Sequence, residues 1–233
     1  MVPDDRTQPP LTRIAVYDLD RTITRAPTWT PLLLHAVTRH APWRLALLPV
    51  VLGAAGLKAL GLIHRDRLKQ VMHRAALGTL SPARADRIAA GWLARFGPKQ
   101  IRSSARAQIA ADRAEGYRIV IATAAYRFYA AAVAREMGAD ALIATATAID
   151  AHGRLLPRIE GGNCYGPAKR AMIERWLADQ GIARDRATVR FYSDHVTDVP
   201  SFEWADERIA VNPHAALRRV ATARGWRQVD WDA

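Results

Sequence analysis

The chain has 233 residues, enough to bury a substantial core as one domain with an insertion, and half of its residues are apolar. Its 34 basic and 22 acidic residues give a formal net charge of +12, so its surface attracts polyanions such as nucleic acid, anionic lipid and phosphorylated metabolites. The single cysteine, Cys164, excludes an internal disulfide and is typical of a reducing compartment.

Residues 1–12 are polar and rich in proline and lack the apolar core of a signal peptide, so we expect a disordered tail on a cytoplasmic protein. The apolar run at 14–17 predicts a buried strand, which leads directly into Asp18 and Asp20, with Thr22 following. Two close carboxylates repel, and burial raises the cost of keeping either ionised. The pair therefore indicates a bound cation, or a reaction that uses the two acids in different roles.

Residues 27–115 contain no strand pattern, and their apolar positions recur at helical spacing. This predicts an all-helical cap inserted after the first strand. Ser81 followed by Pro82 predicts the start of one cap helix, and Gly97 with Pro98 predicts its end.

The most apolar stretch of the chain, residues 42–63, lies inside this cap and has basic residues on both sides. Pro49 and two glycines interrupt its central part, which disfavours a full membrane span. We expect this segment to bind peripherally to the inner face of the cytoplasmic membrane, with its basic flanks contacting anionic lipid headgroups. The alternatives are a buried pair of cap helices and a contact between two copies of the chain.

Strands alternate with helices over residues 116–233, which predicts a parallel sheet covered by helices. Together with residues 13–26, this region forms the expected core domain. The strand patterns lie at 117–123, 141–149, 187–194 and 208–212, with a turn and a returning strand within 151–159; the helical patterns lie at 128–138, 167–181, 200–205 and 214–225.

Polar side chains stand where these strands end. Thr123 follows one predicted strand, Asp194 follows another, and Asp198 comes four residues later. Lys169 opens a helix after a glycine-rich segment. Because a parallel sheet gathers its functional groups at the carboxyl ends of its strands, we expect these side chains to converge with the first aspartate pair in one crevice.

These groups resemble the four motifs of the haloacid dehalogenase (HAD) superfamily in their order and separation: DLDRT at 18–22, the strand ending in Thr123, Lys169, and SDHVTD at 193–198. The helical cap resembles that of subfamily IB, which contains the phosphoserine phosphatases. NCYGPAK at 163–169, YSDHVTDVP at 192–200 and the basic, apolar cap segment resemble bacterial phosphatidylglycerophosphatase C and its relatives. The resemblance implies an α/β fold: a HAD-like Rossmannoid parallel sheet flanked by helices, with an inserted all-helical cap.

The resemblance also implies hydrolysis of a phosphomonoester through an aspartyl-phosphate on Asp18. Asp20 would protonate the leaving oxygen and then take a proton from the attacking water. Mg²⁺, which prefers oxygen ligands, would be held by Asp18, the carbonyl of Asp20 and Asp194. Thr123 and Lys169 would bind the phosphoryl oxygens.

Two further residues would support this machinery. Asp198 would orient Lys169 or a metal-bound water, and Thr22 would bond to the backbone or near the phosphoryl site. Ala124 and His195 depart from the residues common in the family, and both departures concern substrate preference rather than a group that the chemistry requires.

The cap suggests the substrate. We expect a lipid phosphate such as phosphatidylglycerophosphate, because a phosphatase for a small amino-acid ester has no need of a cationic, apolar cap. The alternatives are a soluble phosphoserine-type phosphatase and a non-catalytic binder of membrane or nucleic acid. For specific nucleic-acid binding, the sequence has no helix-turn-helix, zinc or aromatic-platform signature.

Overall fold

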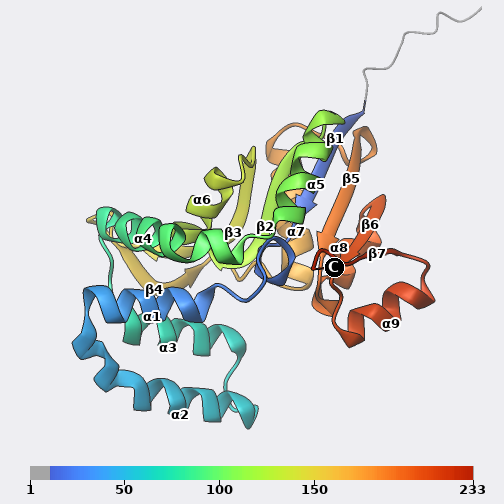
Figure 1. The fold of residues 1–233 in the computed structure, drawn as a ribbon. Helices are drawn as coiled ribbons and strands as arrows, with labels where there is room; N and C mark the ends of the chain where they lie inside the picture. The colour runs from blue at the N-terminus through green and yellow to red at the C-terminus, as the bar shows by residue number, and fades with distance from the viewer. Residues whose placement is uncertain (1–10, 233) are drawn as a thin grey trace, which may run out of the picture.

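The computed structural model describes residues 11–232, which form a seven-stranded sheet flanked by helices (Figure 1). The strand order is β4-β3-β2-β1-β5-β6-β7, and every pair of neighbours is parallel except β3 and β4. The expected α/β class with a parallel sheet is therefore confirmed. Of the tail expected at 1–12, residues 1–10 lie outside the described residues. The strands are β1 Thr12–Tyr17, β2 Arg118–Tyr126, β3 Ala141–Ile149, β4 Leu155–Glu160, β5 Ala187–Ser193, β6 Glu207–Val211 and β7 Arg227–Val229.

Helices cover both faces of this sheet because its central strands are apolar on both sides. Successive residues of a strand point to opposite faces, so Ala15 and Tyr17 enter one buried cluster while Ile14 and Val16 enter the other. Helices α5 and α6 pack against the first face, and α7, α8 and α9 pack against the second. Their bounds are α5 Ser103–Ala114, α6 Arg127–Glu136, α7 Pro167–Asp179, α8 Val199–Trp204 and α9 Ala215–Ala223.

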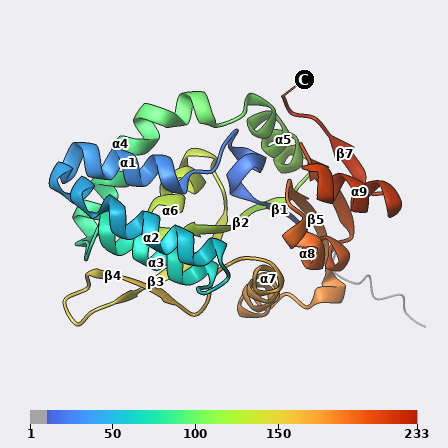
Figure 2. The same ribbon diagram turned by 90° about the horizontal axis from the view of Figure 1, so that it is seen from below.

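Four helices and a 3₁₀ turn between β1 and α5 form a separate layer beside the sheet, as Figures 1 and 2 show from two directions. The β3–β4 hairpin reaches from the sheet edge to this layer, where Leu80 and Leu155 exchange backbone hydrogen bonds of 3.0 and 2.8 Å. The hairpin therefore joins the layer to the edge of the sheet. The elements are α1 Trp29–His40, η2 Pro42–Leu47, α2 Leu48–Ala59, α3 Arg65–Ala76 and α4 Pro82–Gln100.

Helix α5 lies within the span 27–115 but packs directly on the sheet. Its Asp112 is fully buried and accepts hydrogen bonds from Tyr17 (2.5 Å) and Tyr192 (2.9 Å), whose rings are stacked 4.2 Å apart. Arg190 also contacts Asp112 at 2.6 Å. This buried ion pair fixes α5 to β1 and β5, so α5 shares the core beneath the strand ends.

One helix end differs from the expectation. Gly97 and Pro98 do not end α4, which continues to Gln100, and the amide of Ile101 still donates to the Gly97 carbonyl at 2.9 Å. Pro98 stands in the last turn, where its missing N–H removes a single helical hydrogen bond. Gly97 is buried against Leu93, where a Cβ would lie 2.8 Å from the Leu93 Cδ1. The glycine therefore serves close packing, not helix termination.

The apolar segment at 42–63 forms η2, α2 and the turn after them on the outer side of the helical layer (Figure 1). Helix α2 has only Ala54 as a buried residue. Eight large apolar side chains of this segment are 45–75% exposed, and we call them the apolar cap face: Trp43, Leu45, Leu48, Val50, Leu52, Leu57, Leu60 and Leu62. Within one chain the segment is therefore not a buried helix pair. Among residues 11–232, no helix combines the length and apolar character needed to cross a membrane.

Candidate active site

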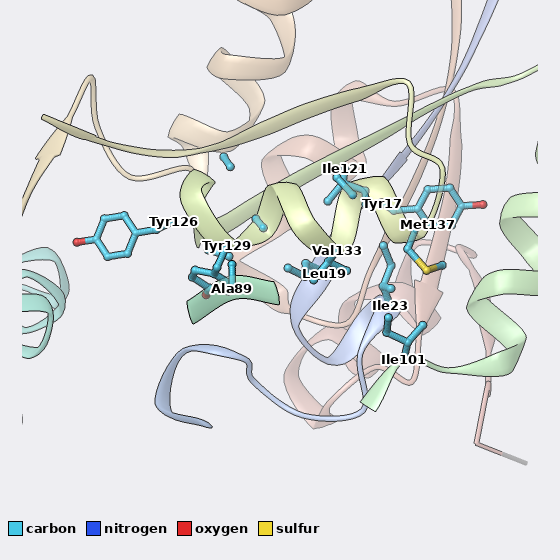
Figure 3. Packing of buried hydrophobic residues seen from close by; sticks show 14 of the residues in the cluster. Tyr17, Leu19, Ile23, Ala89, Ile101, Ile121, Tyr126, Tyr129, Val133 and Met137 are labelled. Carbon is cyan, nitrogen blue, oxygen red and sulfur yellow. The ribbon is translucent and has the colours of Figure 1, made fainter. Parts of the chain in front are cut away.

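The loop after β1 is held in place by two apolar residues that pack into the core. Leu19 and Ile23 of the short helix η1 (Leu19–Ile23) are fully buried, and they point into the cluster that contains Val133 and Ile101 (Figure 3). The amide of Asp18 donates to the Tyr192 carbonyl at 2.9 Å, which extends the pairing with β5 by one residue. The backbone beyond β1 is thereby held in one conformation.

A cavity of about 280 Å³ opens above this loop and collects six of the seven expected site residues. The seventh, Thr22, is fully buried outside the cavity, and its hydroxyl has no hydrogen-bond partner within 11–232. The six residues come from the carboxyl-terminal parts of β1, β2 and β5 or the loops that follow β1 and β5, and from the first turn of α7: Asp18, Asp20, Thr123, Lys169, Asp194 and Asp198.

Lys169 is the centre of a buried charge cluster in this cavity. Its ammonium group donates to Asp18 Oδ1 at 2.7 Å and to Asp198 Oδ2 at 2.6 Å, and the hydroxyl of Ser193 also donates to Asp198, at 2.7 Å. Burial by itself lowers the pKa of Lys169, but the charges of Asp18 and Asp198 outweigh it and raise that pKa above its ordinary value. Lys169 is therefore a fixed positive charge beside Asp18.

Asp20 is held in place by Thr28, which sequence reasoning missed. Asp20 Oδ1 accepts hydrogen bonds from the Thr28 amide at 2.9 Å and hydroxyl at 2.7 Å, and the Tyr129 hydroxyl lies 3.1 Å from that of Thr28. Burial raises the pKa of Asp20, although the bonds from Thr28 act against it. A threonine directly before a predicted helix is a sequence signal, but it predicts an N-cap. The Thr28 hydroxyl bonds to Asp20 instead of capping α1.

Asp18 and Asp194 fit a divalent cation. Asp194 is 4% exposed and receives no side-chain hydrogen bond or ion pair within the described chain, and only Oδ1 of Asp18 is bonded to Lys169. Burial raises the pKa of both carboxyls, that of Asp194 to about 6, and Asp198 reinforces the effect. A bound divalent cation would favour the ionised form of both side chains, and their free oxygens are the ligands that a hard cation such as Mg²⁺ prefers.

No cluster of three or more His, Cys, Asp or Glu side chains with the spacing of a metal site occurs in residues 11–232. The expected ligand set is compatible with this finding, because it draws on two carboxylates and the backbone carbonyl of Asp20. A site of this kind leaves several coordination positions for water and substrate.

The outer wall of the cavity is positively charged. Arg21, at a backbone φ of 64°, and Arg65 of α3 both line it, and the Arg65 guanidinium lies 3.9 Å from the ring centre of Tyr165. His195 also lines it and pairs with the Thr197 hydroxyl at 2.8 Å. Arg65 follows the apolar segment 42–63 in the sequence, and the fold brings it to the cavity wall.

A wider cavity of about 620 Å³ adjoins the first and shares Arg21, Pro27 and Asp194 with it. It contains only Asp194 of the expected catalytic residues. The expected site residues therefore gather in the smaller cavity.

Most of the chain matches one family of known proteins. The family description of haloacid dehalogenase-like hydrolases matches residues 15–203. A probable phosphatase of Mycobacterium tuberculosis is 30% identical over 118 residues, which are 51% of this chain and 40% of that protein, so the chain spans less than half the length of this curated relative.

Two solved structures share the fold. A protein of unknown function from Bordetella pertussis superposes with a TM-score of 0.85 at 28% identity, covering 95% of this chain and 99% of that one. A phospho-aspartyl intermediate analogue of phosphoserine phosphatase superposes with a TM-score of 0.60 at 15% identity, covering 90% of each chain. The family match spans most of the sheet and the cavity-lining loops, and the chain belongs to the haloacid dehalogenase-like hydrolase family.

Proposed function

We propose that this chain is a Mg²⁺-dependent phosphomonoester hydrolase that works through an aspartyl-phosphate on Asp18. The observation that carries the proposal is the meeting of Asp18, Asp20, Lys169 and Asp194 in one cavity of about 280 Å³. A nucleophile, a proton carrier, a fixed positive charge and a cation ligand are the parts that hydrolysis of a phosphate monoester needs.

In the first step, an Asp18 oxygen bonds to phosphorus while the bond from phosphorus to the ester oxygen breaks. Asp20, whose pKa is raised by burial, gives a proton to the leaving oxygen. In the second step, a water oxygen attacks phosphorus, the bond to Asp18 breaks, and Asp20 takes the proton of the water. Lys169 and Thr123 hold the phosphoryl oxygens, and Asp198 keeps Lys169 in position.

Asp18, Asp194 and the carbonyl of Asp20 would hold Mg²⁺. The ion supplies positive charge that offsets the repulsion between the carboxylate of Asp18 and the incoming phosphate dianion. Fixing Asp18 and Asp194 around one cation also removes the penalty of burying two ionised carboxylates.

A lipid phosphate such as phosphatidylglycerophosphate is the proposed substrate. The apolar cap face, residues of the 42–63 segment defined above, is exposed, and no acidic residue occurs in the sequence between Asp20 and Asp66. Arg39, Lys58 and Arg67 are exposed on the same helical layer. An exposed apolar surface on a segment with basic but no acidic residues complements an anionic bilayer, so the protein would dock peripherally with its cap against the membrane.

The charge of the cavity wall favours the same substrate class over phosphoserine. Arg21 and Arg65 form no ion pair with a carboxylate anywhere in 11–232, so they can face a second anionic group such as a phosphodiester. The four acids that line the cavity all have assigned roles, which leaves none for the ammonium group of phosphoserine.

The test is phosphate release by the purified protein with and without Mg²⁺. Phosphatidylglycerophosphate in mixed micelles is compared with O-phosphoserine, using Asp18→Asn as the nucleophile variant and the exposed Asp86→Asn as its matched control. Mg²⁺-dependent release that favours the lipid and disappears only in Asp18→Asn supports the whole proposal. Release favouring phosphoserine retains the reaction and overturns the lipid substrate. Release that survives Asp18→Asn overturns the aspartyl-phosphate.

A further inference from the structure

One buried cation has no part in the proposed reaction. Lys69 of α3 is 9% exposed, and its ammonium group donates to the Ala124 carbonyl and, at 3.2 Å, to Asn163 Oδ1, while lying 4.1 Å from the ring centre of Tyr126. It forms no ion pair with a carboxylate in the described part of the chain. Because burying an ammonium group without a counter-ion is unfavourable, stability alone gives no reason for a lysine here.

Asn163 connects helix α3 of the helical layer to the sheet. Its Oδ1 accepts from Lys69 and, at 2.8 Å, from the Thr145 hydroxyl, and its Nδ2 donates to Asp66 Oδ1 at 2.6 Å. Asp66 and Lys69 both belong to α3, whereas Thr145 is in β3 and Asn163 lies in the loop before α7. Two side chains of the helical layer therefore hold one amide of the core, which is 7% exposed.

The Ala124 carbonyl is available to Lys69 because the sheet is irregular at this point. Thr123 pairs with Ala144 and Tyr126 pairs with Thr145, so the register between β2 and β3 shifts across Ala124. At such a bulge the backbone leaves the regular hydrogen-bond ladder and side chains are re-aimed. The carbonyl accepts from Lys69 and lies 2.9 Å from the Thr145 hydroxyl.

Both groups that would hold the phosphoryl oxygens are attached to the segments that α3 grips. Thr123 immediately precedes Ala124, and Lys169 follows Asn163 by six residues, at the start of α7. Between them the loop turns at Gly166, where φ is +58°. A displacement of α3 would therefore move Thr123 and the loop leading to Lys169 together.

We propose that Asp66 and Lys69 of α3 form a latch on Asn163 and Ala124, and that this latch positions Thr123 and Lys169 for the phosphoryl group. Lys69 is thus a positioning residue that acts through the backbone of β2 and the loop before α7. The inference rests on the proposed phosphatase reaction for its kinetic part, while the mechanical coupling can be measured without turnover.

The kinetic test uses Lys69→Met, which keeps the length of the side chain and removes its donors, and Lys69→Arg, which restores a donor. The exposed Lys99→Met of α4 is the matched control. With p-nitrophenyl phosphate and Mg²⁺ we expect kcat to fall about tenfold or more in Lys69→Met, because small displacements of positioned groups lower the rate steeply. KM should change less, Lys69→Arg should recover most of kcat, and Lys99→Met should equal the wild type.

The mechanical test is amide hydrogen exchange of the same proteins. We expect faster exchange at 120–126 and 160–169 in Lys69→Met, and unchanged exchange at 42–63. Unaltered exchange at 120–126, or a kcat that falls equally in Lys69→Met and Lys69→Arg, overturns the latch. A wild type that releases no phosphate overturns the reaction instead, and faster exchange in Lys69→Met would then still support the latch.

A double-mutant cycle tests whether Lys69 acts through Asn163. Lys69→Met and Asn163→Ala should together lower kcat by less than the product of their separate effects, since each breaks the same contact. Fully multiplicative effects would show that the two residues act independently, which contradicts a shared latch.

Discussion

The ammonium group of Lys169 lies 2.7 Å from an oxygen of Asp18, and both side chains are at least 89% buried. The pairing leaves the second oxygen of Asp18 free to attack or to bind a cation. It also explains the role of Asp198, which holds the same ammonium group from the other side at 2.6 Å. Asp18 and Asp198 together therefore fix the position of the Lys169 ammonium group.

Asp198→Asn is expected to lower kcat by about 10- to 100-fold, since a hydrogen bond to a charged group contributes roughly 1.5–3 kcal/mol. The substitution keeps the shape of the side chain and the contact with Ser193 but removes the charge that holds Lys169. Steady-state kinetics checks this, with the exposed Asp185→Asn as control. An unchanged kcat would contradict the role given to Asp198.

Mg²⁺ should stabilise the folded chain through Asp194. A cation that binds only the native state raises its stability, and here it also relieves the burial of two carboxylates. We expect the unfolding temperature to rise with Mg²⁺ concentration in the wild type and in Asp185→Asn, and to stay constant in Asp194→Asn. A full response in Asp194→Asn would place the cation elsewhere.

Thr28→Val should separate substrates by their leaving groups. Valine removes the hydroxyl that donates to Asp20 at 2.7 Å and keeps the amide bond and the approximate shape. Because a poor leaving group needs protonation by Asp20, hydrolysis of glycerol phosphate should fall about tenfold or more. Hydrolysis of p-nitrophenyl phosphate should change little, since p-nitrophenolate leaves without a proton. Equal losses on both substrates would contradict an effect through Asp20.

His73 should make the fold sensitive to acid. It is fully buried against aromatic rings such as that of Tyr126, and burial, with a smaller effect from Lys69, lowers its pKa from 6.5 to about 4. Between these values the unfolded chain binds more protons than the folded one, so the free energy of unfolding falls as pH falls through 6.5 towards 4. The contribution of this one group is about 3 kcal/mol.

His73→Phe tests this by removing the titrating group while keeping a ring against Tyr126 and Trp29. Urea unfolding at pH 7 and pH 4.5 should show a smaller loss of stability in the variant than in the wild type. An identical loss in both proteins would show that the pKa of His73 is the same in the folded and unfolded chain, which contradicts the prediction.

The apolar cap face gives a direct membrane prediction. Leu52→Asp, at a side chain that is 62% exposed, should weaken sedimentation with anionic vesicles at least about tenfold without lowering the unfolding temperature. Leu11, 49% exposed before β1, provides Leu11→Asp as the matched control, because β1 begins on the opposite side of the molecule from α2 (Figure 1). Equal retention of both variants would exclude this face as the contact.

Local patterns in the sequence identified most of the core and six cavity residues. Apolar runs of strand length, each ending in Asp18, Thr123 or Asp194, were sufficient to predict a parallel sheet and a shared crevice, because parallel strands end at one edge. Two features escaped this reasoning. Strand β7 has only three residues and none is fully buried, so it is too short to show an apolar pattern. Pro98 does not end its helix, because a proline in the last turn removes only one helical hydrogen bond.

Only the tertiary structure decided which distant segments meet. Thr28, Arg65 and Lys69 lie in helical patterns whose apolar faces predict packing but not the neighbour against which they pack. Their contacts with Asp20, Tyr165 and Ala124 depend on how the helical layer sits on the sheet, which is set by many weak side-chain contacts across the chain. The sequence determined the chemistry at the strand ends because that chemistry is local. The residues that the cap contacts are distant in the sequence, so only the tertiary structure identifies them.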